Sequence, residues 1–326
     1  MLLSKTPLRM SWVGGGSDLP AFYKEEPGAV LSTAINKYVY IALNEKFDGK
    51  IRLNYSRTEE VDSVDNIEHP LFKQSLLLTK SDEGLEIASM ADIPSGGSGL
   101  GSSSSFTVGL LNVLYKKKGI NCSSQRLAEE ACEIELIKCR EPIGKQDQYA
   151  AAFGGINLIK FLPDDTVLVD PIKCSNQFQK IIEDYTLVFY TGKTRSASNI
   201  LAQQSLDLRN NDKKNILRKM VKLVYDLKNE IENESVLNFG QILHENWKLK
   251  SQITSGITNF EIDEIYNIGK SNGAIGGKLL GAGNGGFMMF FAPPKTHSLI
   301  RQKLYNFKNV DFKIEKNGSQ IVFNND

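Results

Sequence analysis

One segment, residues 94–105, constrains the fold of this 326-residue chain more than any other. Nine of the ten residues at 96–105 are glycine or serine, and an apolar run starting at Phe106 follows directly. Glycine lets the main chain approach a bound group closely, and the free amides at the start of a helix attract anions. A flexible linker has a similar composition, but a linker rarely leads straight into an apolar helix. We therefore expect a phosphate-binding loop that opens a helix here.

The charge balance excludes several classes of protein. Lysine and arginine total 39 against 38 aspartate and glutamate, which argues against a protein that coats nucleic acid or an anionic membrane. No stretch approaches the roughly 20 apolar residues that span a bilayer, and no secretory signal opens the chain. The four cysteines form no C-x-x-C pair, so free thiols in the cytoplasm are expected. Three scattered histidines disfavour a His-based zinc site or a serine hydrolase.

Periodicity along the chain predicts a mixture of strands and helices. Strand patterns occur at 8–13, 29–43, 51–54 and 85–89, with a helix at 70–78, and helical patterns fill 106–152. Strand patterns return at 155–162, 166–169 and 185–190, and a charged helical region covers 196–272. A strand at 287–291, a helix from 295 to about 307 and two short strands follow. We place a domain boundary near Asp184, which gives units at 1–184 and 185–326.

Two other elements are rich in glycine. The first contains Gly14, Gly15 and Gly16, followed by Ser17 and Asp18, and it does not match a dinucleotide-binding fingerprint. The second, at 281–286, contains Gly283 and Asn284 and lies between apolar runs. Taken alone, this second element is equally well explained as a hairpin turn.

Two carboxylates are candidates for chemistry. Glu135 shares the inward face of its expected helix, 124–139, with Ala128 and Ala131, and burial of a carboxylate is costly unless it meets a cation or a metal. Spacing alone leaves a salt bridge and a Mg²⁺ ligand equally open. Asp147 lies at the start of the next expected helix, where a capping role is the alternative. Lys145 beside it would keep the carboxylate ionised and attract a phosphate.

Taken in order, the three glycine-rich elements resemble the motifs of the GHMP kinase superfamily, named for galactokinase, homoserine kinase, mevalonate kinase and phosphomevalonate kinase. Residues 7–18 resemble the sugar-binding motif, 94–104 the ATP-binding motif and 280–286 the third motif. The resemblance covers nearly the whole chain. It implies an α+β fold of two domains, of which the N-terminal one is ribosomal protein S5 domain 2-like and the C-terminal one is a ferredoxin-like α/β plait.

The resemblance also implies a role for each matched residue. Ser103 and Glu135 match the Mg²⁺ ligands of the family, Asp147 matches the catalytic aspartate, and Arg9 matches the arginine that pairs with it. Asp147, Arg9 and Lys145 make up the expected catalytic group. The residues expected to bind ATP are Pro94, Gly96, Gly97, Ser98, Gly99, Leu100, Gly101, Ser102, Ser103 and Ser104. Those expected to bind the substrate are Gly14, Gly15, Gly16, Ser17, Asp18, Lys193, Arg195, Gly283 and Asn284.

Segments at 14–20, 145–155 and 190–195 resemble a narrower branch, the D-glycero-D-manno-heptose 7-phosphate kinases and bacterial fucokinase-like enzymes. The branch implies phosphorylation of the anomeric hydroxyl of that heptose phosphate to the 1,7-bisphosphate, for GDP-heptose and surface polysaccharide. The glycines before Ser17 disfavour galactose, and Lys193 and Arg195 are either a phosphate clamp or ordinary surface charges.

Two alternatives remain open. One is an anomeric kinase of free fucose or a related hexose, and the other is a non-catalytic sensor of the same fold that binds ATP and sugar. The expected ligands are ATP, Mg²⁺ and a sugar phosphate, in a cytoplasmic protein without nucleic-acid or membrane partners. A homodimer is compatible with this interpretation.

Overall fold

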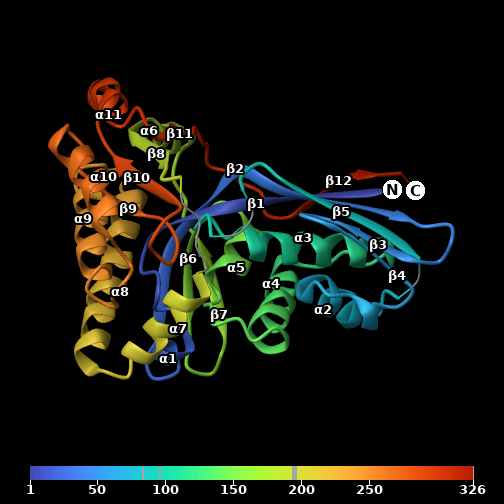
Figure 1. The fold of residues 1–326 in the computed structure, drawn as a ribbon. Helices are drawn as coiled ribbons and strands as arrows, with labels where there is room; N and C mark the ends of the chain where they lie inside the picture. Colours follow the sequence, from blue (N-terminus) through green and yellow to red (C-terminus); the bar gives the residue numbers. More distant parts are fainter. Residues whose placement is uncertain (83, 95–96, 193–196, 326) are drawn as a thin grey trace.

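Two β-sheets organise the chain, which the computed structural model describes over residues 1–326 except 83, 95–96, 193–196 and 326 (Figure 1). The first sheet has eight strands in the described part of the chain and the second has four. The strands of the first sheet are β1 Leu2–Val13, β2 Gly28–Glu45, β3 Ile51–Asn54, β4 Thr58–Val61, β5 Leu85–Ala91, β6 Ile156–Phe161, β7 Val167–Pro171 and β12 Gln320–Asn324.

The long strand β2 holds the first sheet together. It runs antiparallel to β1 over most of its length, while its first half also pairs with β6 and its second half with β5. The strand order is β12-β1-β2-β5-β3-β4, with β6 and β7 continuing from β2. Because β1 ends at Val13 against β2, the glycine-rich segment that follows begins in contact with β2.

Helices cover one face of the first sheet (Figure 1). Among them, α3 packs against both β1 and β2, and Phe106 of α3 meets Phe72 of α2 edge to face at 4.9 Å between ring centroids. These contacts place the start of α3 close to β1. The helices formed by the chain up to Tyr185 are α1 Pro20–Tyr23, α2 Pro70–Thr79, α3 Ser102–Lys117, α4 Ser124–Cys132, a π-helix Glu133–Lys138, α5 Gln146–Phe153 and α6 Asn176–Tyr185, with a 3₁₀ turn at Val64–Asn66.

The second sheet is antiparallel throughout, in the order β11-β8-β10-β9. Its central strand β10 is fully buried, and Phe291 stacks on Phe239 of α9 at 4.4 Å between ring centroids. Its strands are β8 Thr186–Tyr190, β9 Gly276–Leu279, β10 Phe287–Phe291 and β11 Lys308–Asn309. Its helices are α7 Ala197–Asp207, α8 Asn211–Glu232, α9 Phe239–Lys250, α10 Phe260–Ser271 and α11 His297–Lys303, with a 3₁₀ turn at Pro294–Thr296.

The expected α+β class is confirmed, and three local expectations change. The helix expected at 124–139 is α-helical only to Cys132 and then widens into a π-helix. Strand β4 and helices α1 and α6 were not predicted. Strand β12 pairs with β1, so the last strand of the unit expected at 185–326 lies in the first sheet. The boundary at Asp184 stays a prediction.

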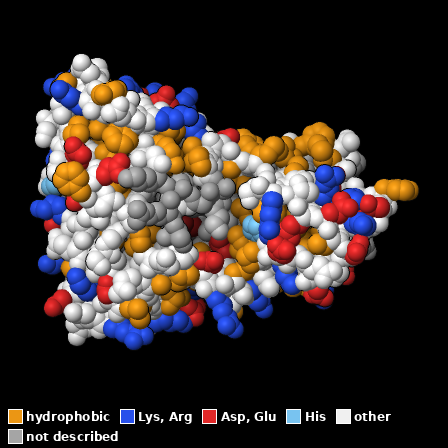
Figure 2. Space-filling model, in the orientation of Figure 1, with side chains coloured by type: hydrophobic (Ala, Val, Ile, Leu, Met, Phe, Trp, Pro, Cys, Tyr) orange, Lys and Arg blue, Asp and Glu red, His pale blue; other side chains and the backbone are white. Residues whose placement is uncertain are grey.

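The surface carries charges of both signs. Figure 2 shows Lys and Arg side chains interspersed with Asp and Glu on the face that it displays. In the described part of the chain, no helix has both the length and the hydropathy needed to cross a bilayer.

Candidate active site

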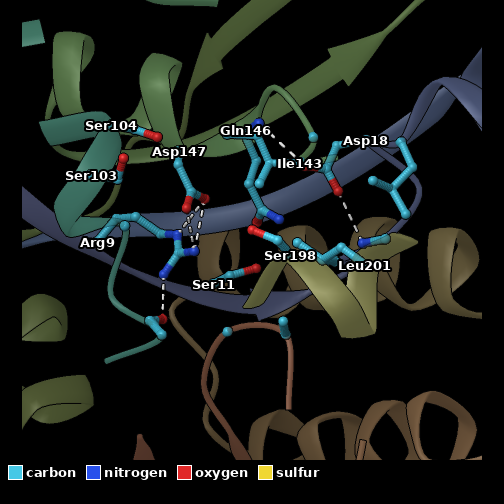
Figure 3. A pocket seen from close by; sticks show the side chains of 18 of the residues that line it. Arg9, Ser11, Asp18, Ser103, Ser104, Ile143, Gln146, Asp147, Ser198 and Leu201 are labelled. Atoms are coloured by element: carbon cyan, nitrogen blue, oxygen red, sulfur yellow. Dashed lines mark hydrogen bonds and ion pairs between the residues drawn. The ribbon is translucent and has the colours of Figure 1, made fainter. Parts of the chain in front are cut away.

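A cavity of about 330 Å³ lies where the three glycine-rich loops meet (Figure 3). The first loop follows β1, the second precedes α3, and the third joins β9 to β10. The start of α5, helix α7 and the end of α9 also contribute to the wall. The residues that line it include Arg9, Ser11, Gly15, Asp18, Ser103, Gln146, Asp147, Gln204, Lys250, Lys278 and Gly281.

Arg9 and Asp147 form a two-pronged ion pair in this cavity. The Arg9 Nε donates to Asp147 Oδ1 at 2.8 Å, and Nη2 donates to Oδ2 at 2.7 Å. The remaining nitrogen, Nη1, donates to the carbonyl of Gly99 at 2.6 Å. The arginine is almost fully buried, whereas 23% of the Asp147 side chain is exposed. The pair therefore fixes a carboxylate at the cavity wall and leaves part of it open to a ligand.

Asp18 is a second carboxylate of the cavity, and it is held by the backbone. Its Oδ1 accepts from the amide of Gly16 at 2.9 Å and its Oδ2 from the amide of Gln146 at 3.3 Å. Burial and the nearby charge of Asp147 raise the pKa of Asp18, while the two amides oppose that shift. A Cβ on Gly144 would lie 1.9 Å from Asp18 Oδ2, so this glycine makes room for the carboxylate.

The second loop gives α3 an open N-terminus. Gly101, at the N-cap, has φ +75° and no side chain caps the helix, so its first amides are free to bind an anion. The loop is tied to β1, because the amide of Arg9 donates to the carbonyl of Leu100 at 3.0 Å. These features fit the expected phosphate-binding loop. Pro94 lines a neighbouring cleft, and Gly96 lies outside the described residues.

The second and third loops are packed glycine against glycine. A Cβ on Gly99 would lie 2.3 Å from the carbonyl oxygen of Leu280, and one on Gly281 would lie 2.3 Å from the Cα of Gly99. Similarly, a Cβ on Gly286 would lie 2.5 Å from the carbonyl oxygen of Ser98. The two loops can approach this closely only because glycine stands at the contacts.

Glu135 is fully buried beneath the start of α3. Its Oε1 accepts from the hydroxyl of Ser103 at 2.8 Å and its Oε2 from the side-chain Nε2 of Gln148 at 2.5 Å. Burial raises the pKa of Glu135 to about 7, and hydrogen bonds from Ser103, Ser104 and Gln148 oppose the shift. The π-helix presents Glu135 at this point, and such turns recur at functional sites. The expected neighbours Ser103 and Glu135 are thus in contact.

Lys145 forms its ion pair with a residue other than Asp147. Its ammonium pairs with Asp165 Oδ1 at 3.1 Å and lies 4.9 Å from the centroid of the Tyr23 ring. Instead of pairing with Asp147, Lys145 shares Asp165 with Lys24 and Tyr23. Among the described residues, the ion pair of Lys145 goes to Asp165 and that of Asp147 to Arg9, so the catalytic role of Lys145 stays a prediction.

Two of the residues expected to bind the substrate, Gly14 and Ser17, instead stabilise the first loop. The hydroxyl of Ser17 donates to the carbonyls of Gly14 and Ala29, both at 2.9 Å, and is buried. A Cβ on Gly14 would lie 2.1 Å from the Ala29 carbonyl oxygen. Gly14 and Ser17 therefore fasten the first loop to β2 and do not line the cavity. Gly15, Gly16 and Asp18 do line it.

In the third loop, Gly283 and Asn284 turn away from the cavity. The amide of Asn284 donates to the carbonyl of Ile257 at 2.9 Å, and its side-chain oxygen accepts from Asn259 at 2.7 Å. The part of this loop that reaches the cavity is Gly281 and Ala282. The expected clamp, Lys193 and Arg195, lies outside the described residues.

Sequence reasoning missed two lysines in the cavity wall. Lys250, at the end of α9, donates to the carbonyl of Gly281, and burial lowers its pKa to about 8. Lys278 in β9 is almost wholly buried, donates to the carbonyl of Ser11 at 2.6 Å, and has a pKa lowered by burial. For Lys278, the available signal was a lysine within the short strand β9, because lysine is almost never fully buried unless it is paired.

A second cleft of about 740 Å³ adjoins the cavity and shares Ser102 and Ser103 with it. Aromatic side chains line it, including those of Tyr55, His69 and Phe106. Burial lowers the pKa of His69, which favours the neutral ring. The two hollows thus meet at the N-terminus of α3.

Comparison with known proteins supports the resemblance along the chain. The N-terminal domain of the GHMP kinases matches residues 69–155, and their C-terminal domain matches residues 227–309. The D-glycero-alpha-D-manno-heptose 7-phosphate kinase of Campylobacter jejuni is 30% identical over 314 residues, which cover 91% of each chain. The chain belongs to the GHMP kinases. It is therefore an ATP-dependent phosphotransferase with the two-domain fold of that family.

Two further relatives of this GHMP kinase are informative. The crystal structure of a D-glycero-D-manno-heptose 1-phosphate kinase from Bacteroides thetaiotaomicron superimposes with a TM-score of 0.83 at 25% identity, and the match covers 100% of both chains. The bifunctional fucokinase/GDP-fucose pyrophosphorylase of Arabidopsis thaliana is 26% identical over 94% of this chain. The chain spans only 31% of the length of that plant protein.

Proposed function

We propose that the chain transfers the γ-phosphate of ATP to the anomeric hydroxyl of D-glycero-D-manno-heptose 7-phosphate, giving the 1,7-bisphosphate that GDP-heptose synthesis for surface polysaccharide would use. The observation that carries the kinase chemistry is the partly exposed Asp147, held by Arg9 within the cavity at whose wall α3 begins. The heptose phosphate acceptor is supported by the 30% identity to the Campylobacter jejuni enzyme.

In this proposal the triphosphate of ATP lies along residues 97–104, where the free amides of α3 and the glycine backbone receive its oxygens. The adenosine extends into the second cleft, whose aromatic side chains suit a purine ring. Transfer of a phosphoryl group depends mainly on alignment and on neutralisation of charge. Asp147 then accepts the proton of the hydroxyl or orients it, while Arg9 fixes the carboxylate and Asp18 receives sugar hydroxyls.

Ser103 and Glu135 suit a Mg²⁺ ion that is shared with the nucleotide. Both are oxygen donors, and two protein ligands are enough for an ion that keeps several waters and binds phosphate oxygens. Without a cation, burial raises the pKa of Glu135 to about 7. When bound, Mg²⁺ would neutralise phosphate charge. In the described residues no three His, Cys, Asp or Glu side chains cluster as an all-protein metal site.

A kinase of free fucose is the second candidate, favoured by the 26% identity to the plant fucokinase. A panel of free and phosphorylated heptoses and hexoses, assayed by ADP release, separates the two. We expect turnover with heptose 7-phosphate and a product whose new phosphorus signal couples to the anomeric proton. Turnover with fucose alone would overturn the heptose assignment, and no ADP release with any sugar would favour a non-catalytic sensor.

The remaining expectations stay proposals. Lys193 and Arg195 would bind the phosphate that the acceptor already carries. Replacing both with alanine would then raise KM for phosphorylated sugars and spare unphosphorylated ones, and equal effects on both would refute the clamp. A homodimer and a cytoplasmic location also remain to be measured.

A further inference from the structure

Gly15 differs from its two neighbours in the first loop. Gly14 and Gly16 have φ angles of +86° and +105°, and a Cβ on either would lie within 2.3 Å of another atom. The loop conformation therefore requires glycine at both positions. At Gly15, φ is not positive and a Cβ would lie at least 3.6 Å from the nearest atoms. Alanine would fit there, so folding alone does not explain the glycine.

The space over Gly15 is surrounded by polar atoms from three separate elements. A Cβ at this position would lie 3.6 Å from the Ser11 hydroxyl, 3.8 Å from the Gln146 Nε2 and 4.0 Å from the Lys250 Nζ. Ser11 comes from β1, Gln146 from α5 and Lys250 from α9. Figure 3 shows Ser11 and Gln146 between the Arg9–Asp147 pair and Asp18. All three atoms can donate a hydrogen bond into one space.

Two of these side chains have unused hydrogen-bonding capacity although they are buried or half-buried. The Ser11 hydroxyl has no partner within the described residues, and neither does the Gln146 Oε1, the accepting atom of the amide whose Nε2 borders the space. Lys250 is 5% exposed and donates to the Gly281 carbonyl, which occupies one of the three donors of its ammonium. Buried polar atoms normally have partners, so a set that faces one cavity points to a ligand.

We propose that Lys250 is an acceptor-binding residue that holds an oxygen atom of the sugar in the space over Gly15, together with Ser11 and Gln146. This inference rests on the proposed function and extends it, because it assigns part of acceptor recognition to the second half of the chain. Three donors around one position select an oxygen that accepts hydrogen bonds. That oxygen belongs either to a hydroxyl of the sugar or to the phosphate that the acceptor carries.

The decisive variants are Gly15→Ala, which fills the space without a clash, and Lys250→Met, which removes the charge at similar length. The control is Lys270→Met. Lys270 also donates to a backbone carbonyl, that of Ile275 at 2.6 Å, but it does not line the cavity. Steady-state kinetics with D-glycero-D-manno-heptose 7-phosphate and with the free heptose, and calorimetric titration of each sugar without nucleotide, provide the readouts.

We expect both variants to raise KM and Kd for the acceptor by about 10-fold or more, with KM for ATP unchanged within about 2-fold. Lys270→Met should match the wild type. An effect of Lys250→Met on both sugars would assign the oxygen to a hydroxyl, and an effect on the phosphorylated sugar alone would assign it to the phosphate.

An unchanged acceptor KM in Gly15→Ala, or an equal rise in KM for ATP, would overturn the inference while leaving the kinase assignment intact. A wild-type chain that phosphorylates neither sugar would instead remove the proposed function, and this inference with it. Thermal melting of each variant shows whether a loss of binding reflects a loss of fold.

Discussion

Arg9 contacts two functional parts of the cavity with one guanidinium group. It holds both oxygens of Asp147 at 2.8 and 2.7 Å and reaches the carbonyl of Gly99 at 2.6 Å. The proposed acceptor-activating carboxylate and the proposed phosphate loop are therefore positioned by the same side chain. A planar guanidinium can satisfy three acceptors in this arrangement, which an ammonium cannot reproduce.

Asp147→Asn should reduce kcat by about 100-fold or more, because an amide neither accepts the proton nor pairs with Arg9 through two oxygens. Binding of ATP should persist, since Asp147 is not part of the phosphate loop. The checks are ADP release at saturating sugar and titration with a fluorescent ATP analogue. Near-normal turnover would rule out the assigned role.

Arg9→Lys should lower kcat by about 10-fold or more, since lysine can hold either Asp147 or the Gly99 carbonyl but not both. The matched control is Arg52→Lys. Arg52 forms an exposed pair with Glu86 at 3.7 Å, and such pairs contribute little. Rates of the two variants are compared at saturating ATP and sugar, and similar rates would contradict the proposed positioning.

Glu135→Gln should raise the Mg²⁺ concentration needed for half-maximal activity by about 10-fold, because an amide is a weaker ligand for a hard cation. Glu133→Gln is the control, since Glu133 is on the same π-helix but is partly exposed and pairs with Lys138 at 3.3 Å. Magnesium titrations of activity distinguish them. An unchanged requirement in Glu135→Gln would exclude Glu135 as a ligand.

KM for the acceptor should be steady below about pH 8 and rise above it. Burial lowers the pKa of Lys250 to about 8, and the charge of Arg9 adds to this effect while Asp18 and Asp147 oppose it. Deprotonation above that pH removes the charge that binds the sugar. Lys250→Arg should stay charged and lose the rise, even if its affinity is lower at neutral pH. A rise that persists in Lys250→Arg would mean that another group causes it.

Gly144→Ala should weaken acceptor binding, with KM for the sugar raised by about 10-fold. The new Cβ would lie 1.9 Å from Asp18 Oδ2, so the carboxylate must move out of the place that the amides of Gly16 and Gln146 fix. Calorimetric titration with the sugar gives the comparison. Affinity equal to that of the wild type would show that Asp18 does not contact the acceptor.

The sequence predicted those parts of the fold and site that depend on residues close together in the chain or on a recognisable motif. Residues 96–105 indicated a loop that leads into a helix, and Ser103 and Glu135, expected at one metal site, are in contact. The partner of Lys145 could not be predicted in this way, because Asp165 lies 20 residues further along the chain. Lys250 was missed for a related reason. Lys250 is buried because the end of α9 packs against Gly281, and the sequence around Lys250 contains no pattern that predicts this contact.

The glycine contact between Gly99 and Gly281 joins parts of the chain that are far apart in sequence. A larger residue at either place would push the opposite loop aside, and no replacement at the other place could be smaller than glycine to compensate. A change at one of these two positions therefore cannot be compensated by a change at the other. Exchanging halves with a distant homologue should succeed only when both parents carry glycine at both positions.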